Sequence, residues 1–239
     1  VSPILNDLRI ISELENCKTH LLFASGNAAG ATAEFGGGIY ELTLDGSWEY
    51  RKVIDGICHG LIKFQDNFIC IDDHRGIAEF DRDFKIIRSR ELPQNSRGHG
   101  VVYSEERKQF FVVASYSDSI LVLDDDFKVV DTIKISNKFD LYGQHCHHCN
   151  DIAIFGNSIY VSMFSITGNW RRDVFDGVVM EYDIDTKEPI GPVVSDLWMP
   201  HSVMFIGENL LVLDSLRGQL KKNNAMAVGE FPGFTRGIA

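Results

Sequence analysis

One pattern recurs along this chain, and it limits the possible folds more than any other feature. Three stretches show it clearly: "CHGLIKFQDNFICIDD" (58–73), "GHGVVYSEERKQFFVVAS" (98–115) and "PHSVMFIGENLLVLDS" (200–215). Each opens with a polar pair, continues into a short apolar run, turns, and enters a second apolar run. Short apolar runs bounded by Gly, Asn, Asp and charged residues are typical of β-strands joined by tight turns.

Four strands are predicted in each repeat, and successive repeats are about 35 to 53 residues apart, a period typical of propeller blades. Second strands are expected at 21–25, 68–72, 110–115, 159–164 and 210–215, and third strands at 37–46, 75–83, 119–126 and 177–185, with a weaker one at 217–223. A single four-stranded blade cannot bury both of its faces, so blades pack around a common axis. We therefore predict an all-β fold, a β-propeller of four-stranded antiparallel blades that forms a single domain over residues 1–239.

The polar pairs that precede the first strands give the number of blades. They are His59-Gly60, His99-Gly100, Asn150-Asp151, His201-Ser202 and Arg236-Gly237, and "NDLRII" from Asn6 matches "NDIAIF" from Asn150. Six first strands predict six blades, of which the last is incomplete within this sequence. The alternative is five blades that close around an extra strand.

The charge of the chain restricts its partners. The formal net charge is −11, whereas nucleic-acid binding needs a basic surface, so we expect no nucleic-acid partner. No apolar run approaches the ~18 residues of a membrane-spanning helix, so we expect no membrane insertion. Five scattered cysteines form no dense disulfide framework, and the first residues lack a secretory signal pattern. These features predict a cytoplasmic protein.

Two C-terminal segments carry a resemblance to known proteins. "MPHSVMFIGENLLVLDSLRGQL" and the following "FPGFTRGIA" resemble an uncharacterised bacterial propeller family that has no established activity. The repeat as a whole is similar to the six-bladed propeller superfamily, which includes NHL-repeat proteins, gluconolactonase-like and regucalcin-like proteins, streptogramin lyase and the peptidylglycine amide lyase. The resemblance implies the fold more strongly than any function, because one fold hosts many activities.

First strands of a propeller line the central channel, so the residues at their starts should converge on one mouth of that channel. The expected ring is Asn6, His59, His99, Asn150, His201 and Arg236. Three imidazoles from separate strands suit a catalytic divalent metal ion, zinc first, which would keep one position for water. The guanidinium of Arg236 could hold an anionic group of a substrate. A polar, water-filled channel or an anion-binding mouth without metal is the alternative.

The resemblance bears on this ring in two ways. The amide lyase is similar in using three histidines on a metal, whereas gluconolactonase-like members use a carboxylate with Asn and Asp, and the ring here contains no Glu. Nearby, "YGQHCHHCND" (142–151) places His147 and His148 just before Asn150, and one of them is expected to reach the same mouth. Its two cysteines could alternatively form a small metal clip.

These observations lead to one main hypothesis and one alternative. The main hypothesis is a propeller that binds a small molecule or metal ion at the channel mouth, with hydrolase or lyase activity as the chemistry such a site supports. Its predicted residues are the metal ligands His59, His99 and His201, the catalytic residues Arg236 and His148, and the ligand-binding residues Asn6, Asn150, Asp151 and Trp170. The alternative is a non-catalytic propeller that binds a protein or glycan through its loops, in particular loop 165–177. The sequence leaves open whether the protein is an enzyme.

Overall fold

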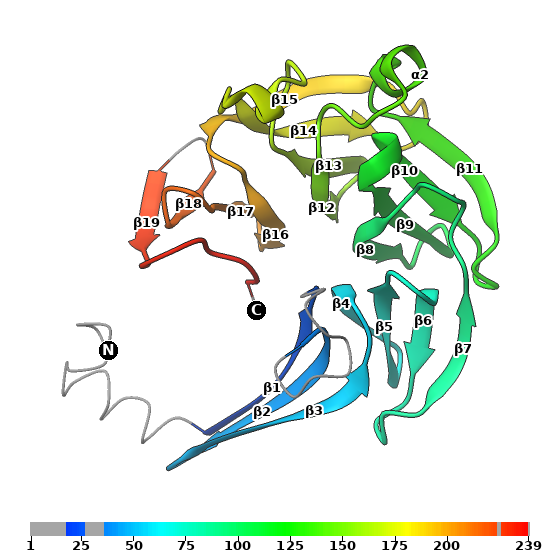
Figure 1. Cartoon of the computed structure of the whole chain (residues 1–239), viewed down its shortest axis with the longest axis vertical. Helices are drawn as coiled ribbons and strands as arrows, with labels where there is room; N and C mark the ends of the chain where they lie inside the picture. Colours follow the sequence, from blue (N-terminus) through cyan, green and yellow to red (C-terminus); the bar gives the residue numbers. More distant parts are fainter. Residues whose placement is uncertain (1–17, 27–35, 224–225, 239) are drawn as a thin grey trace.

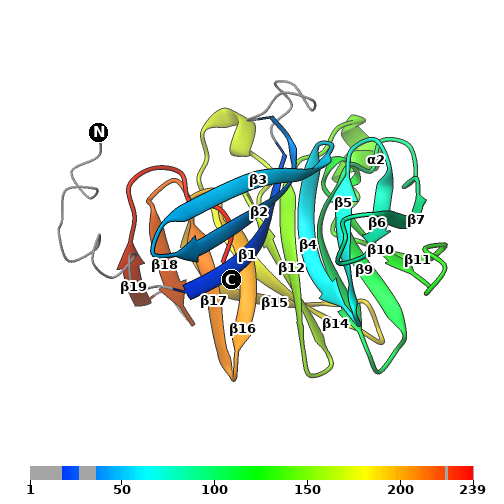
Figure 2. The ribbon, with the colours of Figure 1, turned by 90° about the horizontal axis from the view of Figure 1, so that it is seen from below.

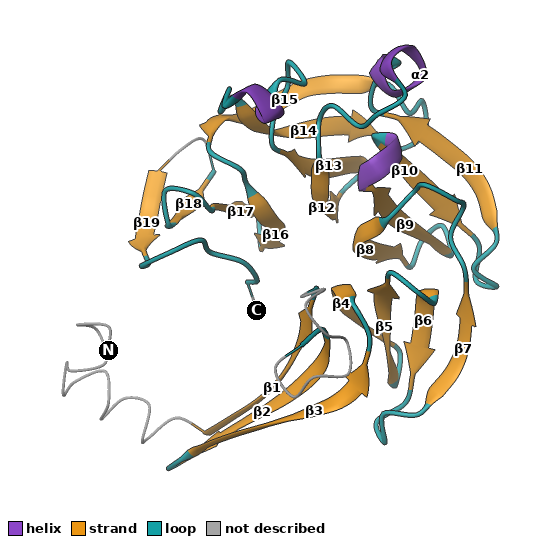
Figure 3. Ribbon diagram, viewed as in Figure 1, coloured by secondary structure: helices purple, strands orange, loops and turns teal. Residues whose placement is uncertain are grey.

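The structure is a computed structural model that describes residues 18–26, 36–223 and 226–238, and β-strands make up most of it (Figures 1 and 3). Five antiparallel sheets stand around a central axis as the blades of a propeller. The predicted all-β propeller is therefore confirmed. The loops carry one short helix, α2 (Lys138–Tyr142), and the 3-10 turns η2 (Ser115–Ser117) and η3 (Trp170–Arg172). No helix of the described residues is long and apolar enough to cross a membrane.

The blades follow one another along the chain, and within each blade every strand pairs with the next in sequence. The strands are, blade by blade, β1 (Lys18–Ser25), β2 (Gly38–Asp45) and β3 (Trp48–Asp55); β4 (Cys58–Phe64), β5 (Asn67–Asp72), β6 (Gly76–Phe80) and β7 (Ile86–Arg90); β8 (Gly98–Ser104), β9 (Gln109–Ala114), β10 (Ser119–Leu123) and β11 (Val129–Lys134); β12 (Cys149–Phe155), β13 (Ser158–Met163), β14 (Gly177–Asp183) and β15 (Pro189–Leu197); and β16 (His201–Ile206), β17 (Asn209–Asp214), β18 (Gln219–Lys222) and β19 (Met226–Glu230). The predicted second strands coincide with β1, β5, β9, β13 and β17 to within a few residues. Strand β19 was not predicted, because "MAVGE" lacks a clear apolar alternation.

The count of five blades matches the alternative prediction and not the preferred count of six. Residues 231–238, expected to open a sixth blade, form no strand and run back toward the centre beside β16 (Figure 1). This segment is held by the last blade, since Phe231 N donates to Gly218 O at 2.7 Å and Gly237 N donates to Ser202 Oγ at 2.9 Å. The first strand expected at Asn6 lies outside the described residues.

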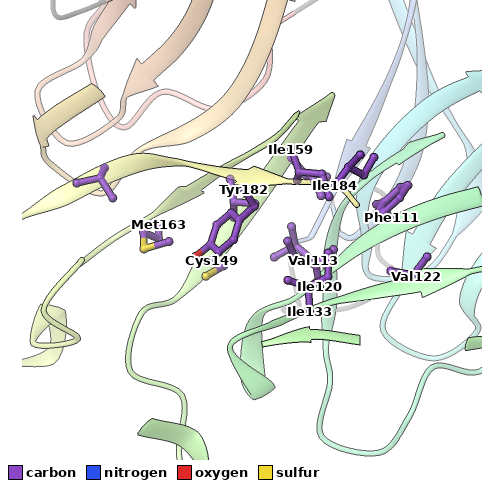
Figure 4. Close-up of a cluster of buried hydrophobic side chains, with 13 residues drawn as sticks. Phe111, Val113, Ile120, Val122, Ile133, Cys149, Ile159, Met163, Tyr182 and Ile184 are labelled. Atoms are coloured by element: carbon purple, nitrogen blue, oxygen red, sulfur yellow. The ribbon is translucent and has the colours of Figure 1, made fainter. Parts of the chain in front are cut away.

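A separate apolar core lies between each two blades that follow one another along the chain. Between the third and fourth blades, Phe111, Val113 and Ile120 pack against Ile159 and Tyr182 (Figure 4). Equivalent clusters join the first blade to the second, the second to the third and the fourth to the fifth. Full burial of one such side chain is worth about 1.5–3 kcal/mol, so the repeated apolar strands stabilise the ring blade against blade, as the repeat predicted.

The third and fourth strands are joined by turns that aspartates organise. Asp81 Oδ1 accepts hydrogen bonds from the backbone N–H groups of Asp83 and Lys85, both at 2.9 Å. Asp124 and Asp183 make the same kind of turn in the next two blades. Aspartate suits such turns because its side chain can accept hydrogen bonds from backbone N–H groups that follow it.

Buried aspartates fix the chain just before it enters the innermost strands. Asp72 accepts the N–H of Ile57 at 3.1 Å, and Asp214 accepts the N–H of Trp198 at 2.7 Å. Asp118 does the same for Cys146, at 2.5 Å. All three carboxylates are at most 1 % exposed. They therefore fix where β4, β12 and β16 begin, and the first residues of these strands form the site.

Glycines allow the innermost strands to approach one another closely. A Cβ atom on Gly60 would lie 2.5 Å from His99 O, and one on Gly100 would lie 2.7 Å from Asp151 Cα. In these two polar pairs, the second residue thus faces the innermost strand of the following blade. The first residue of the pair is left to face the axis.

Candidate functional site

Strands β4, β8, β12 and β16 lie around the axis, and each brings an imidazole or an amide to the start of the strand (Figure 1). Figure 2 shows that β4 begins at the edge of the ring where α2 lies and runs to the opposite edge. The first residues of β4 therefore lie at the edge that carries α2. The rings of His59 and His99 stack there, with 4.3 Å between centroids and 13° between planes. The prediction that these two histidines meet at the axis is confirmed for this pair.

His148 extends the cluster into the fourth blade. Its backbone is left-handed (φ 50°), and its ring lies 6.0 Å from that of His99, 4.9 Å from that of Trp170 and 4.3 Å from that of Phe164. Phe164 in turn lies edge-on to His201, with 5.1 Å between ring centroids. One continuous run of rings therefore links His59 to His201, as the predicted ring requires.

His201 is held in one tautomer. Its Nδ1 lies 3.0 Å from the backbone carbonyl of Met199, which can only accept a hydrogen bond, so Nδ1 carries the proton. Ser215 Oγ is also within 2.8 Å of Nδ1. In a neutral ring, Nε2 is then an acceptor, and Nε2 of His201 is buried without a hydrogen-bond partner in the protein. This nitrogen is a free base inside the site.

Asn150 and Asp151 contact the backbone of the strands that carry the histidines. Asn150 Nδ2 donates to the carbonyls of His148 at 3.1 Å and Pro200 at 3.2 Å, so it ties together the residues that carry His148 and His201. The carboxylate of Asp151 lies between innermost strands, close to Gly100, and accepts the N–H of Ile152 at 2.9 Å. Burial raises the pKa of Asp151 to about 7. The Asp151 side chain thus lies among the innermost strands, and its role in ligand binding stays a prediction.

The C-terminal segment brings Arg236 to the same mouth. Phe234 packs edge-on against His201, with 5.2 Å between ring centroids, and the guanidinium of Arg236 lies 5.4 Å from the Phe234 ring. Although much of the Arg236 side chain is exposed, burial of its guanidinium lowers its pKa, and the charge of Arg97 adds to this. The predicted proximity of Arg236 to the histidines is borne out by these contacts.

Arg97 and Asp73 belong to the site but were not predicted. Asp73 Oδ1 lies 3.2 Å from His59 Nε2, and Asp73 Oδ2 lies 3.3 Å from Arg97 Nε, although neither pair has hydrogen-bond geometry. Burial pushes the pKa of Asp73 up, but His59 and Arg97 outweigh it, so the net pKa is lowered. Arg97 also lies over the ring of Tyr116, at 5.0 Å.

A backbone rule explains why Arg97 and His148 reach the mouth. Both lie two residues before a ring residue, and both have positive φ, 40° for Arg97 and 50° for His148. Met199, two residues before His201, has φ 52°. This left-handed turn directs the side chain toward the axis. The position two residues before the polar pair was therefore the feature of the sequence that could have identified Arg97 and His148 as site residues.

Several polar atoms in the mouth are buried without a hydrogen-bond partner in the protein. They are Nε2 of His59, His99 and His201, Nδ1 of His148, Nε of Arg97, Nε1 of Trp170 and Oδ1 of Asn150. Leaving one such group unsatisfied costs about 1–3 kcal/mol. So many in one place make the mouth the candidate site among the described residues.

Three imidazoles of the mouth, those of His99, His148 and His201, are kept neutral by burial. Burial lowers the pKa of His99 and of His201 well below the usual value, and nearby histidines and arginines lower both further. The pKa of His148 falls to about 3, first through burial and then through His145 and the arginines. Neutral rings keep one basic nitrogen each, which can accept a proton or bind a metal.

The four side chains of "CHHC" have different surroundings and do not form a metal clip. Cys149 is fully buried in the core between the third and fourth blades, and burial raises its pKa. The ring of His147 contacts Ser165 O at 2.8 Å and Ser136 Oγ at 2.9 Å. Of the four, only His148 joins the mouth.

The predicted three-histidine zinc site fits the described geometry poorly. A zinc ion lies about 2.0–2.1 Å from each imidazole nitrogen, in the plane of the ring. The stacked rings of His59 and His99 have nearly parallel planes, so their lone pairs do not point to a common centre. Among the described residues, no group of three His, Cys, Asp or Glu side chains is arranged to hold a metal ion. The zinc site stays a prediction.

Comparisons with known proteins bear on the fold. No protein family matches the sequence, and no curated protein matches it either. Solved structures do match: a chain of a nidogen/laminin complex (TM-score 0.64, 15 % identity, 86 % of this chain and 73 % of that one) and virginiamycin B lyase from Staphylococcus aureus (TM-score 0.51, 12 % identity, 90 % and 75 %). These matches agree with the β-propeller fold described above. At such low identity the likeness extends to the fold alone, and a bacterial origin stays a prediction.

Proposed function

We propose that the protein binds a small molecule at the mouth of the central channel and that neutral imidazoles there take part in proton transfer. One observation carries this proposal: imidazoles from separate blades gather at the axis, each with a buried ring nitrogen that has no hydrogen-bond partner in the protein. A packed channel has no need to hold three ring nitrogens, those of His99, His148 and His201, without a partner in the protein.

The arrangement suits a lyase or hydrolase that abstracts a proton. His201 Nε2 is the best-defined base, because its tautomer is fixed by Met199. Like His201, His148 is a weak base while burial keeps its pKa low, since a general base works best when its pKa is near the working pH. A negatively charged ligand beside it would raise that pKa. Trp170 packs over His148 and supplies an aromatic wall.

One structural neighbour is compatible with this chemistry. A catalytically inactive histidine-to-alanine variant of the Staphylococcus aureus virginiamycin B lyase has been solved with quinupristin. That statement concerns the lyase. It supports the proposal here only by showing that a propeller of this general fold can depend on a histidine for catalysis.

A thermal-shift screen tests the binding proposal. A library of small carboxylic acids, phosphate esters, amides and sugars is tested on the wild-type protein, on His99→Gln and on His201→Gln, with His20→Gln on the exposed first blade as the matched control. A ligand at 100 times its Kd should raise the Tm by roughly 5–10 °C. We expect this rise to shrink in the two mouth variants and to persist in the control.

The result that refutes the proposal is equally specific. Ligands that stabilise all four proteins equally bind elsewhere, and a library without any mouth-dependent ligand argues for the alternative, a non-catalytic scaffold. Turnover of a mouth-dependent ligand, followed by mass spectrometry, should be lost in His148→Gln while binding is retained, whereas His201→Gln should weaken binding as well. Elemental analysis of the purified protein, with and without His59→Ala, tests the zinc prediction in the same preparation.

Two further assignments go with this proposal. A protein partner at loop 165–177 is less supported than a small ligand, because Trp170 of that loop packs onto His148 and Phe164 instead of standing free. We retain a cytoplasmic location as a proposal. The four described cysteines are free and buried, which suits a reducing compartment.

A further inference from the structure

We infer that the ligand of the mouth carries an oxyanion group, a carboxylate or a phosphoryl group, and that this group binds between the guanidinium groups of Arg97 and Arg236. The inference rests on the proposed function, since it names the class of ligand for the same site. It goes beyond a single anion clamp at Arg236 because it adds a second arginine from another blade.

The two arginines reach the histidine cluster from different blades. Arg97 precedes β8 and is fixed by Tyr116, whose hydroxyl accepts a hydrogen bond from Arg97 Nη1 at 2.5 Å. Arg236 follows β19 and is fixed beside β16, through Phe234 and through the hydrogen bond of Gly237 to Ser202. The charges of both arginines lower the pKa of His99 and of His148, so both guanidinium groups lie near these rings.

The charges of this region are unbalanced. Arg97 shares the single carboxylate of Asp73 with His59, and among the described residues no carboxylate lies within ion-pair distance of Arg236. Guanidinium groups stay protonated in proteins, and the buried histidines between them are neutral. The mouth is therefore positive, although the whole chain has a net charge of −11. A positive recess in an acidic protein selects anions.

Donor groups of the mouth also call for an acceptor. Trp170 Nε1 is buried without a hydrogen-bond partner in the protein, and Arg97 Nε has only the Asp73 carboxylate, at 3.3 Å and outside hydrogen-bond geometry. Both groups can only donate, so a ligand that satisfies them must offer acceptor atoms, and an oxyanion offers the most. His201, which is 6 % exposed, keeps a buried Nε2 without a partner, and this nitrogen can accept a proton from the ligand or from water.

There is room beside Arg97 for the uncharged part of a ligand. A cavity of about 330 Å³ between the second and third blades is lined by Arg97 and Leu92 together with the acidic residues Asp72, Asp73 and Glu91. Asp73 is the carboxylate that also contacts His59. A small organic anion can therefore place its charged group between the arginines and its body in the cavity.

Binding of an anion should also take up protons. The charges of Arg97 and Arg236 are among the causes that keep the pKa of His99 low, and an oxyanion would offset them. Protonation of a neighbouring imidazole then becomes easier in the complex than in the free protein. Affinity should rise as the pH falls, which a neutral ligand would not show.

The experiment measures binding of three probes by isothermal titration calorimetry at low ionic strength. The probes are inorganic phosphate, malonate and its neutral counterpart malonamide. The variants are Arg97→Gln, Arg97→Lys and Arg236→Gln, with Arg82→Gln as the matched control, because Arg82 lies in an exposed turn paired to Asp66. Circular dichroism and the Tm of each variant check that it is folded.

We expect an oxyanion to bind the wild-type protein and Arg82→Gln equally. Loss of a charge-assisted hydrogen bond should weaken binding about ten- to a hundredfold in Arg97→Gln and Arg236→Gln. Arg97→Lys should recover part of that loss, since the charge returns without the planar fork. The stronger of phosphate and malonate identifies the phosphoryl or the carboxylate source. Titration in buffers of different ionisation enthalpy should show proton uptake.

Three results would overturn the inference. Equal binding of phosphate and malonate to wild-type protein and to both glutamine variants places the anion elsewhere. Binding of malonamide as tight as that of malonate removes the need for charge, yet leaves the proposed small-molecule function intact. Failure of both oxyanions to bind folded wild-type protein also refutes it. In that case the library screen, which includes neutral amides and sugars, decides the proposed function separately.

Discussion

Replacement of Asp151 by Asn should change how the stability of the protein depends on pH. Burial raises the pKa of the Asp151 carboxyl to about 7 in the folded protein, against an ordinary value of 3.8. The folded state therefore binds a proton more tightly than the unfolded state. The stability that this proton contributes is fully present below about pH 4 and is lost as the pH rises through 7.

The size of the effect follows from the two pKa values. At about 1.4 kcal/mol for each pH unit between them, Asp151 should lower the free energy of unfolding by roughly 3 kcal/mol between pH 5 and pH 8. The asparagine side chain imitates the protonated acid and has no charge to bury. The difference in stability between wild-type protein and Asp151→Asn should therefore move in favour of the variant by about that amount.

The comparison of two proteins is needed because the histidines act in the opposite direction. Burial lowers the pKa of His99 and of His201, so their contribution to stability is present above about pH 6.5 and is lost as the pH falls. This contribution is common to both proteins and cancels in the difference.

Urea denaturation at pH 5, 6, 7 and 8, followed by far-ultraviolet circular dichroism, measures the difference. Asp66→Asn is the matched control, because the Asp66 side chain is 92 % exposed in the turn before β5. The reasoning is refuted when the difference between wild-type protein and Asp151→Asn stays constant over this range, or when Asp66→Asn reproduces the same change.

Three other outcomes are expected. Gly100→Ala should lower the free energy of unfolding, measured by urea denaturation, by about 1–3 kcal/mol, because its Cβ would lie 2.7 Å from Asp151 Cα. Gly156→Asn, in open space at φ 58°, is the control and should change the free energy of unfolding by less than about 0.5 kcal/mol. Asp214→Ala should cost about 3–5 kcal/mol, since it leaves the buried ammonium of Lys221 without its partner at 3.0 Å, and Asp196→Ala, an exposed carboxylate, should cost far less; equal losses contradict this. NMR of the ring C–H groups should show His99, His148 and His201 unprotonated at pH 6. Arg236→Gln should raise the pKa of His201, because the charge of Arg236 lowers it. An unchanged His201 titration in that variant would show that Arg236 lies too far from His201 to affect its pKa.

The sequence alone determined the strands, their turns and their assembly into blades. Apolar runs such as those of β5, β9 and β17 alternate with turn residues at a nearly constant period, and such strands can bury their faces only against copies of the same unit. The polar pairs also located His59, His99 and His201 at the channel, because their place at the start of the innermost strand is a property of the repeat.

Tertiary structure decided what the repeat could not. Arg97 and His148 reach the mouth through a left-handed turn two residues before the strand, and neither residue type announces that conformation. Asp73 joins His59 and Arg97 only because the loops of two blades meet there. The number of blades likewise depends on how the segment after β19 packs against β16. These features arise from distances between blades and from backbone angles, whereas periodicity reports only which face of a strand is buried.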